Sequence, residues 1–235
     1  PLLIDARRAY EWFENNLVII SPTMKPSGLA HKLDVDSEFL HYAEQIMCTF
    51  NVGIKKLQII KKPIQAFFGD DNKDEMETLI QKLAESPSGI LGLHTNSGEE
   101  LVAVQEEDNV FIKQLKTEHV DKNGQSVTFD LSEESDGSVR LLDYLPAFKD
   151  VLTKDVTYFI DEIERSIHPI LIKELLGKFS EDDNSKGQLI FTTHESNLLD
   201  QDLFRLDEIW FAEKDGSGST DLYSLCDFKV HNTID

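Results

Sequence analysis

The sequence predicts an α/β protein with a mostly parallel sheet, supplemented by a helical insertion and an antiparallel β insertion. In the second half, apolar runs of strand length alternate with helical patterns, which is typical of a parallel sheet covered on both faces. Between residues 90 and 120, short alternating segments are separated by Gly and Asn, which indicates antiparallel strands.

In the first half, apolar residues at a spacing of three or four positions predict helices. The predicted helices span Asp5–Leu17, Asp36–Phe50 and Glu75–Leu83. A strand at Val18–Ile20 follows the first helix, and a loop at Pro22–Gly28 follows the strand. The clearest antiparallel strands are Leu101–Val104 and Val110–Ile112.

In the second half, strands and helices are expected in alternation. The expected strands are Ser126–Leu131, Val156–Ile160, Gln188–Thr193, Glu208–Ala212 and Leu222–Leu225. The expected helices are Gly137–Leu152 and Ile167–Phe179, each with an apolar stripe. Pro146 lies inside the first of these helices, where it predicts a kink or a helix restart.

Composition restricts the possible functions. The formal net charge of −21 argues against direct nucleic-acid binding by this surface, because phosphate contacts need clustered Lys and Arg. Cys48 and Cys226 lack the spacing of a zinc site and give no disulfide framework. No apolar run approaches the roughly 18 residues of a membrane span, and no signal peptide is evident. We therefore expect a cytoplasmic protein without a membrane partner.

Asp161 and Glu162 form the most informative motif. They directly follow the apolar strand Val156–Ile160, and the carboxyl end of a buried parallel strand is where a site forms. There, the first carboxylate can hold Mg²⁺ on a nucleotide and the second can orient or deprotonate a water. The alternative is a core strand that ends in a charged, solvated turn.

Three further segments strengthen this interpretation. The Ser135–Gly137 loop opens a helix and could approach an anion, although an ordinary helix cap explains it as well. His194 follows the strand Gln188–Thr193, where it could reach a phosphate or a water, or be purely structural. The turn that carries Ser166 and His168 could instead be a helix start, with Ser166 as the cap and Pro169 in the first turn.

The order of these segments carries a family resemblance. A signature-like loop, a strand with Asp-Glu, a Ser-containing turn and a strand with His resemble an ABC-type (SMC-related) ATPase. More narrowly, 134–229 resembles the ABC-like AAA-family ATPases of bacterial anti-phage defence and abortive infection. The resemblance rests on Ser135–Leu142, Phe159–Pro169 and Gln188–His194, and on the closing segments Asp207–Phe211 and Leu222–Lys229.

The resemblance implies a P-loop NTPase, and specifically the C-terminal lobe of one. It implies that Asp161 is the Mg²⁺-linked Walker B carboxylate, Glu162 the catalytic base and His194 the switch histidine. Ser135 and Gly137 would be signature contacts to ATP, and Ser166 and His168 would lie in the D-loop. The implied units are a remnant of the N-terminal lobe (1–24), a helical insertion (25–88), an antiparallel β insertion (89–124) and the C-terminal lobe (125–235).

One departure from the family pattern is large: no G-x-x-x-x-G-K-[ST] phosphate loop occurs in the sequence. We therefore expect a fragment that lacks the Walker A lobe and is inactive alone. The intact protein is expected to bind ATP and Mg²⁺ between two protomers of a homodimer, and to act with an effector protein that the sequence does not identify. The alternatives are a non-hydrolytic nucleotide-sensing or interaction module and the ATPase subunit of a DNA-acting nuclease system.

Overall fold

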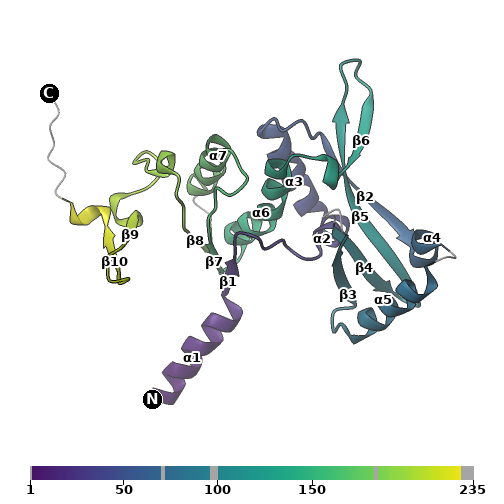
Figure 1. Cartoon of the computed structure of the whole chain (residues 1–235), viewed down its shortest axis with the longest axis horizontal. Coiled ribbons are helices and arrows are strands. Elements are labelled where there is room, and N and C mark those ends of the chain that lie inside the picture. Colours follow the sequence, from purple (N-terminus) through teal and green to yellow (C-terminus); the bar gives the residue numbers. More distant parts are fainter. Residues whose placement is uncertain (1, 70–71, 96–99, 183–184, 229–235) are drawn as a thin grey trace.

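The computed structural model describes residues 2–69, 72–95, 100–182 and 185–228 of the chain (Figure 1). The strands of this part form a three-stranded parallel sheet, a larger antiparallel sheet and a two-stranded antiparallel sheet. This confirms an α/β protein in which a parallel sheet is combined with antiparallel elements. Cys48 and Cys226 are both free and exposed.

The parallel sheet has the strand order β1-β7-β8, formed by Leu17–Ile20, Thr157–Ile160 and Gln188–Phe191. Its register aligns Ile19 with Phe159 and Ile190, so these side chains share one face. The opposite face packs against α6 (Asp136–Thr153) and α7 (Pro169–Ser180). We expected helices on both faces, which is wrong for the described residues, because Ile19 and Ile190 remain 58% and 41% exposed.

The antiparallel sheet contains β2 (Lys56–Pro63), β3 (Ile90–His94), β4 (Glu100–Glu106), β5 (Asn109–Val120) and β6 (Ser126–Asp130). Its order is β2-β5-β4-β3, and β6 pairs with the far end of β5. Val102, Val104 and Leu115 face the core formed with α2 (Leu29–Val35) and α3 (Ser37–Thr49). The other face packs on α4 (Ile64–Phe68) and α5 (Lys73–Glu85).

Two of these strands fall outside the expected range of the antiparallel insertion. β2 lies within 25–88, and β6 belongs to the antiparallel sheet and not to the parallel one. The connection from β5 to β6 is a tight turn in which Asp121 accepts hydrogen bonds from the backbone of Asn123 and Gln125. How the chain divides into domains stays a prediction.

The helix α6 begins at a side-chain cap and runs past its proline. The Ser135 hydroxyl accepts a hydrogen bond from the backbone N–H of Ser138 at 3.1 Å. The helix continues over 18 residues with Pro146 inside it, so the expected restart does not occur. Its buried residues include Leu141, Leu145 and Phe148, which places α6 at the centre of the core.

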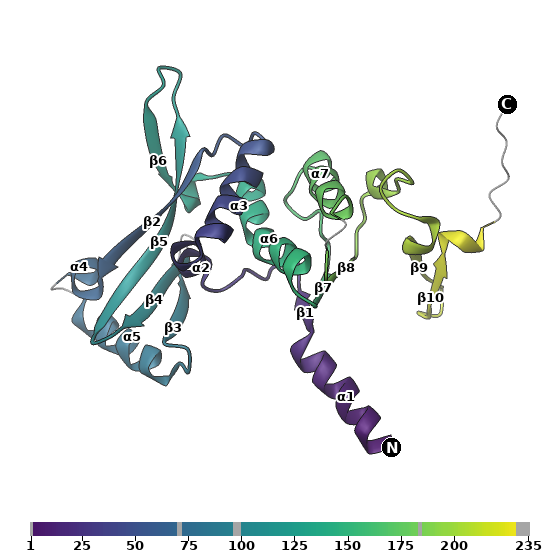
Figure 2. The same cartoon turned by 180° about the vertical axis from the view of Figure 1, so that it is seen from behind.

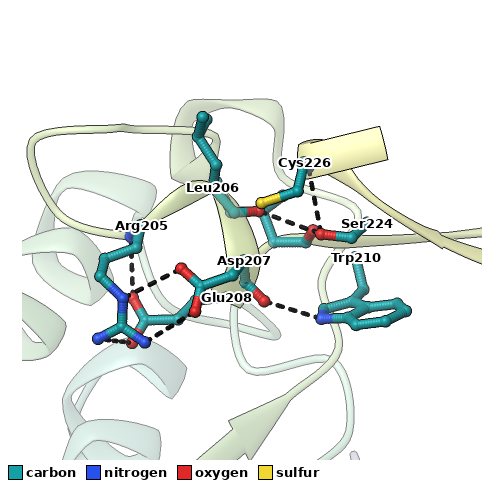
Figure 3. Close-up of polar contacts among 8 residues, drawn as sticks. Arg205, Leu206, Asp207, Glu208, Trp210, Ser224 and Cys226 are labelled. Carbon is teal, nitrogen blue, oxygen red and sulfur yellow. Dashed lines mark hydrogen bonds and ion pairs between the residues drawn. The ribbon is translucent and has the colours of Figure 1, made fainter. Parts of the chain in front are cut away.

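The strands β9 (Trp210–Lys214) and β10 (Thr220–Ser224) pair with each other in antiparallel fashion and lie apart from β8 (Figures 1 and 2). Both strands lie near their expected positions, but they form a separate sheet and do not extend the parallel one. Figure 3 shows the polar contacts that close this unit: Trp210 donates to the Asp207 carbonyl at 3.0 Å, and Ser224 donates to the Leu206 carbonyl at 3.3 Å. Lys229, the last residue of the closing motif, lies outside the described residues.

The helix α1 (Leu2–Asn15) extends away from the rest of the chain (Figures 1 and 2). Several of its large apolar side chains are exposed, among them Ile4 at 58%, Tyr10 at 65% and Phe13 at 61%. Together with Ile19 of β1, they leave apolar surface at this end of the molecule open to further packing.

Candidate functional site

Asp161 and Glu162 lie at the carboxyl end of the central parallel strand. Ile160 pairs with Phe191, so the residues after the two strands, Asp161 and Thr192, meet at the same edge of the sheet. The Thr192 hydroxyl donates to Asp161 Oδ1 at 2.6 Å and accepts from the backbone N–H of Glu162 at 2.9 Å. One threonine therefore fixes both carboxylate residues.

The turn after β7 is strained and firmly anchored. Glu162 and Ser166 have φ angles of +50° and +65°, in the left-handed region that non-glycine residues seldom adopt. Such a conformation costs about 1–3 kcal/mol per residue and is frequent at functional sites. Ile163 and Ile167, at 0% and 4% exposure, insert from the same turn into the core. Their burial offsets the strain and leaves the polar residues at the surface.

His194 is brought to this turn through its backbone. Its N–H donates to Glu164 Oε1 at 3.0 Å, and the imidazole itself is exposed. On the other side, Arg165 Nη1 lies 3.4 Å from Glu162 Oε2 in a partly exposed ion pair. The structure therefore gathers Asp161, Glu162 and His194 around one turn, as the sequence predicted for their positions at strand ends.

Ser135, Gly137 and Ser166 form a second group beside the first. A Cβ at Gly137 would lie 2.9 Å from the Ser166 carbonyl oxygen, so only glycine fits there without a shift of the backbone. Ser135, two residues earlier, caps α6. The ordinary-cap alternative is thus confirmed for Ser135, although a cap leaves the first-turn N–H groups near the surface for an anion.

His168 has the capping function that the alternative interpretation of this turn gave to Ser166. Its Nδ1 accepts from the backbone N–H of Ile170 at 3.3 Å, and Pro169 is the first residue of α7. The alternative of a helix start is correct except for its cap, because Ser166 lies two residues before the cap position in a left-handed conformation. Pro169 in the first turn is confirmed.

A cleft of about 350 Å³ lies next to the second group. The loop after β1, the start of α6, Arg165 and Ser166 line it, whereas Asp161, Glu162 and His194 are not among its lining residues. Arg140, only 7% exposed, donates to the Met24 carbonyl at 2.6 Å and so joins α6 to the loop after β1. Beside it, burial raises the pKa of Asp143 to about 7, with Arg140 opposing the shift.

Sequence reasoning missed three residues of the site: Thr192, Glu164 and Arg165. The alignment of the parallel strand ends contained a signal for Thr192, because residues that follow paired strands face each other. Glu164 and Arg165 gave no such signal, since their contacts depend on how the turn folds back.

The residues present suit a magnesium nucleotide in part. The carboxylate oxygens of Asp161 are hard ligands of the kind that Mg²⁺ binds, usually with phosphate and water oxygens. Within the described residues, no group of three or more His, Cys, Asp or Glu is placed to hold a metal ion. A site here would accordingly need oxygens from the nucleotide and from a phosphate-binding loop.

Residues 30–200 match the family described as "AAA domain, putative AbiEii toxin, Type IV TA system". The chain belongs to this family of AAA domains. No curated protein matches the chain. Membership confirms the resemblance to AAA-family ATPases of the abortive-infection type, and thus a P-loop ATPase in general.

AAA ATPases bind ATP with Mg²⁺, which agrees with the carboxylates at the end of β7. The ABC-like subtype and the roles of individual residues in this AAA domain stay predictions. None of the helices in the described ranges is long and apolar enough to cross a membrane.

Proposed function

We propose that this AAA domain is the C-terminal portion of an ABC-like, SMC-related ATP-hydrolysing switch protein. ATP is held between two protomers, and hydrolysis releases them. The observation that carries the proposal is the paired carboxylate turn: Asp161 and Glu162 follow a central parallel strand and share Thr192 as a partner, and Glu162 is held in a left-handed backbone conformation.

Each polar residue of the turn has a role in this proposal. Asp161 binds Mg²⁺ on the nucleotide, and Glu162 accepts a proton from the attacking water. His194 contacts the water or the terminal phosphate. Ser135 and Gly137, at the start of α6, contact the ATP held by the partner protomer. Ser166 and His168 belong to the turn at that same protomer contact.

The phosphate loop is supplied by a lobe outside these 235 residues, since no such motif occurs in them. The uncovered face of the parallel sheet supports this part of the proposal. Parallel sheets are almost always covered on both faces, yet Ile19 and Ile190 are exposed here. The edge of β8 pairs with no further strand in the described ranges, so a strand of the phosphate-binding lobe could extend the sheet.

Glu162→Gln in the full-length protein tests the proposal. We expect magnesium-dependent ATP hydrolysis to fall roughly 100-fold or more, the contribution of a general base, while ATP binding persists and dimers accumulate. Glu174→Gln, at an exposed position on α7, is the matched control. The 235-residue chain alone should not hydrolyse ATP. Unchanged hydrolysis in Glu162→Gln would refute the assignment of the base.

A non-hydrolytic interaction module is the second candidate, because the sequence contains no phosphate loop. It predicts that the full-length protein binds its partner without ATP turnover, and that Glu162→Gln changes nothing. The same assay therefore separates the two functions.

A further inference from the structure

Glu164 is a carboxylate that the proposed chemistry does not use. It lies two residues after Glu162, and its Oε1 accepts the backbone N–H of His194 at 3.0 Å. The Thr193 hydroxyl forms a second hydrogen bond to the same carboxylate. Glu164 therefore binds the start of the loop after β8 to the turn after β7.

The other oxygen of Glu164 faces the interior. Oε2 is buried and has no hydrogen-bond partner among the described residues, and the same is true of Arg140 Nε and Tyr144 Oη on α6. Leaving such a group unpaired costs about 1–3 kcal/mol. The Arg140 guanidinium lies 4.4 Å from the centre of the Tyr144 ring. Burial raises the pKa of Tyr144, and the nearby charge of Glu164 adds to that shift.

Glu164 is ionised at neutral pH although it is partly buried. Burial works against the charged form, but the hydrogen bonds from the His194 N–H, from its own backbone N–H and from Thr193 together hold the pKa below the ordinary value. A charged acceptor makes a stronger hydrogen bond to the His194 N–H than a neutral one. The bond is therefore suited to fixing the loop.

We propose that Glu164 is a positioning residue: its carboxylate holds His194 beside the Asp161–Glu162 pair, at the point where the turn meets α6. The inference rests on the proposed function, because it is that function which gives His194 a role in ATP hydrolysis. A residue that served stability alone would gain by pairing its second oxygen. Glu164 instead leaves that oxygen unpaired while its other oxygen holds the His194 N–H.

Three variants of the full-length protein test the proposal. Glu164→Ala should lower kcat about 10- to 100-fold, the usual effect of losing a residue that orients an active-site group, with KM changed less than threefold. Glu164→Asp withdraws the carboxylate from the His194 N–H and should give a smaller loss of kcat. Glu164→Gln keeps an acceptor oxygen at the same distance from the His194 N–H and should retain most of the parent kcat. Glu174→Ala is the matched control at an exposed glutamate.

Amide hydrogen exchange at residues 192–195, measured without nucleotide, supplies a readout that needs no ATP turnover. We expect exchange at His194 to be about tenfold faster in Glu164→Ala than in Glu174→Ala, and close to the parent in Glu164→Gln. If the parent hydrolyses no ATP, the proposed function fails, while exchange still decides whether Glu164 holds His194.

Two results would overturn the positioning role. One is parent-like kcat and parent-like His194 exchange in Glu164→Ala. The other is a loss of kcat that follows global unfolding and is not rescued by Glu164→Gln. If Glu164→Ala does not fold, Glu164→Asp decides, because parent-like values there contradict the proposal equally.

Discussion

Replacing Asp143 by Asn should change the pH dependence of stability in a defined way. Asp143 lies on α6 with a side chain only 10% exposed, and Arg140 Nη1 lies 3.9 Å from its Oδ2. Burial raises its pKa to about 7, while Arg140 and Lys25 reduce the shift. The carboxyl group is therefore uncharged in the folded protein at mildly acidic pH and charged above pH 7.

The direction of the effect follows from proton binding. The unfolded chain releases the Asp143 proton near pH 3.8 and the folded chain near pH 7, so between these values the folded state binds more protons. Stability therefore falls as pH rises through this window, by about 1.4 kcal/mol per unit. The full penalty above pH 7 is on the order of 4 kcal/mol. Asn at this position avoids that penalty at every pH.

Urea unfolding of the parent and Asp143→Asn, at intervals between about pH 5.5 and pH 8.5, measures this difference. The free energy of unfolding of the variant should exceed that of the parent by an amount that grows up to about pH 7 and then levels off. Asp202→Asn removes a charge from an exposed site and should leave the pH dependence unchanged. A difference for Asp143→Asn that does not vary with pH would refute the reasoning.

Three further substitutions test the packing of the site, each by urea unfolding. Thr192→Val removes the hydroxyl that holds both carboxylate residues and should cost about 0.5–1.5 kcal/mol, because these hydrogen bonds are exposed to water. Thr192→Ser should recover most of that loss, and equal stability of Val and Ser would contradict the role of the hydroxyl. Gly137→Ala places a Cβ 2.9 Å from the Ser166 carbonyl oxygen and should cost about 1–3 kcal/mol. A variant as stable as the parent would contradict this close approach. Ile160→Ala, at 0% exposure in β7, should cost about 2–5 kcal/mol, and a loss below 1 kcal/mol would show that β7 is not in the core.

Local patterns predicted the elements that bear the site. The strand expected at Val156–Ile160 was found at Thr157–Ile160, and the strand expected at Gln188–Thr193 was found at Gln188–Phe191. Both predictions were accurate because continuous apolar runs specify buried strands regardless of their partners. These two strands also predict the placement of Asp161, Glu162 and His194, since residues at the ends of adjacent parallel strands must lie close together.

Strand partners were harder to predict, because pairing depends on contacts distant in sequence. Even so, the sequence contained signals for the antiparallel pairing of β6 and of the two strands β9 and β10. Asn123-Gly124 between β5 and β6 is a strong hairpin signal, and it predicts antiparallel pairing. The connection from β9 to β10, at 215–219, is too short for the crossover that parallel neighbours require. No local signal showed that one face of the parallel sheet would lack a helical layer.

The strained turn and the uncovered sheet face are connected by the energetics of the fold. Holding Glu162 and Ser166 in left-handed backbone costs about 1–3 kcal/mol each, and the burial of Ile163 and Ile167 repays it only while the core is intact. That core covers only one face of the three-stranded parallel sheet. Another layer over Ile19 and Ile190 would therefore stabilise the turn by making the sheet more rigid, without contacting Asp161 or Glu162. Contact with a phosphate-binding lobe and precise placement of the Asp161–Glu162 pair would then be a single folding event.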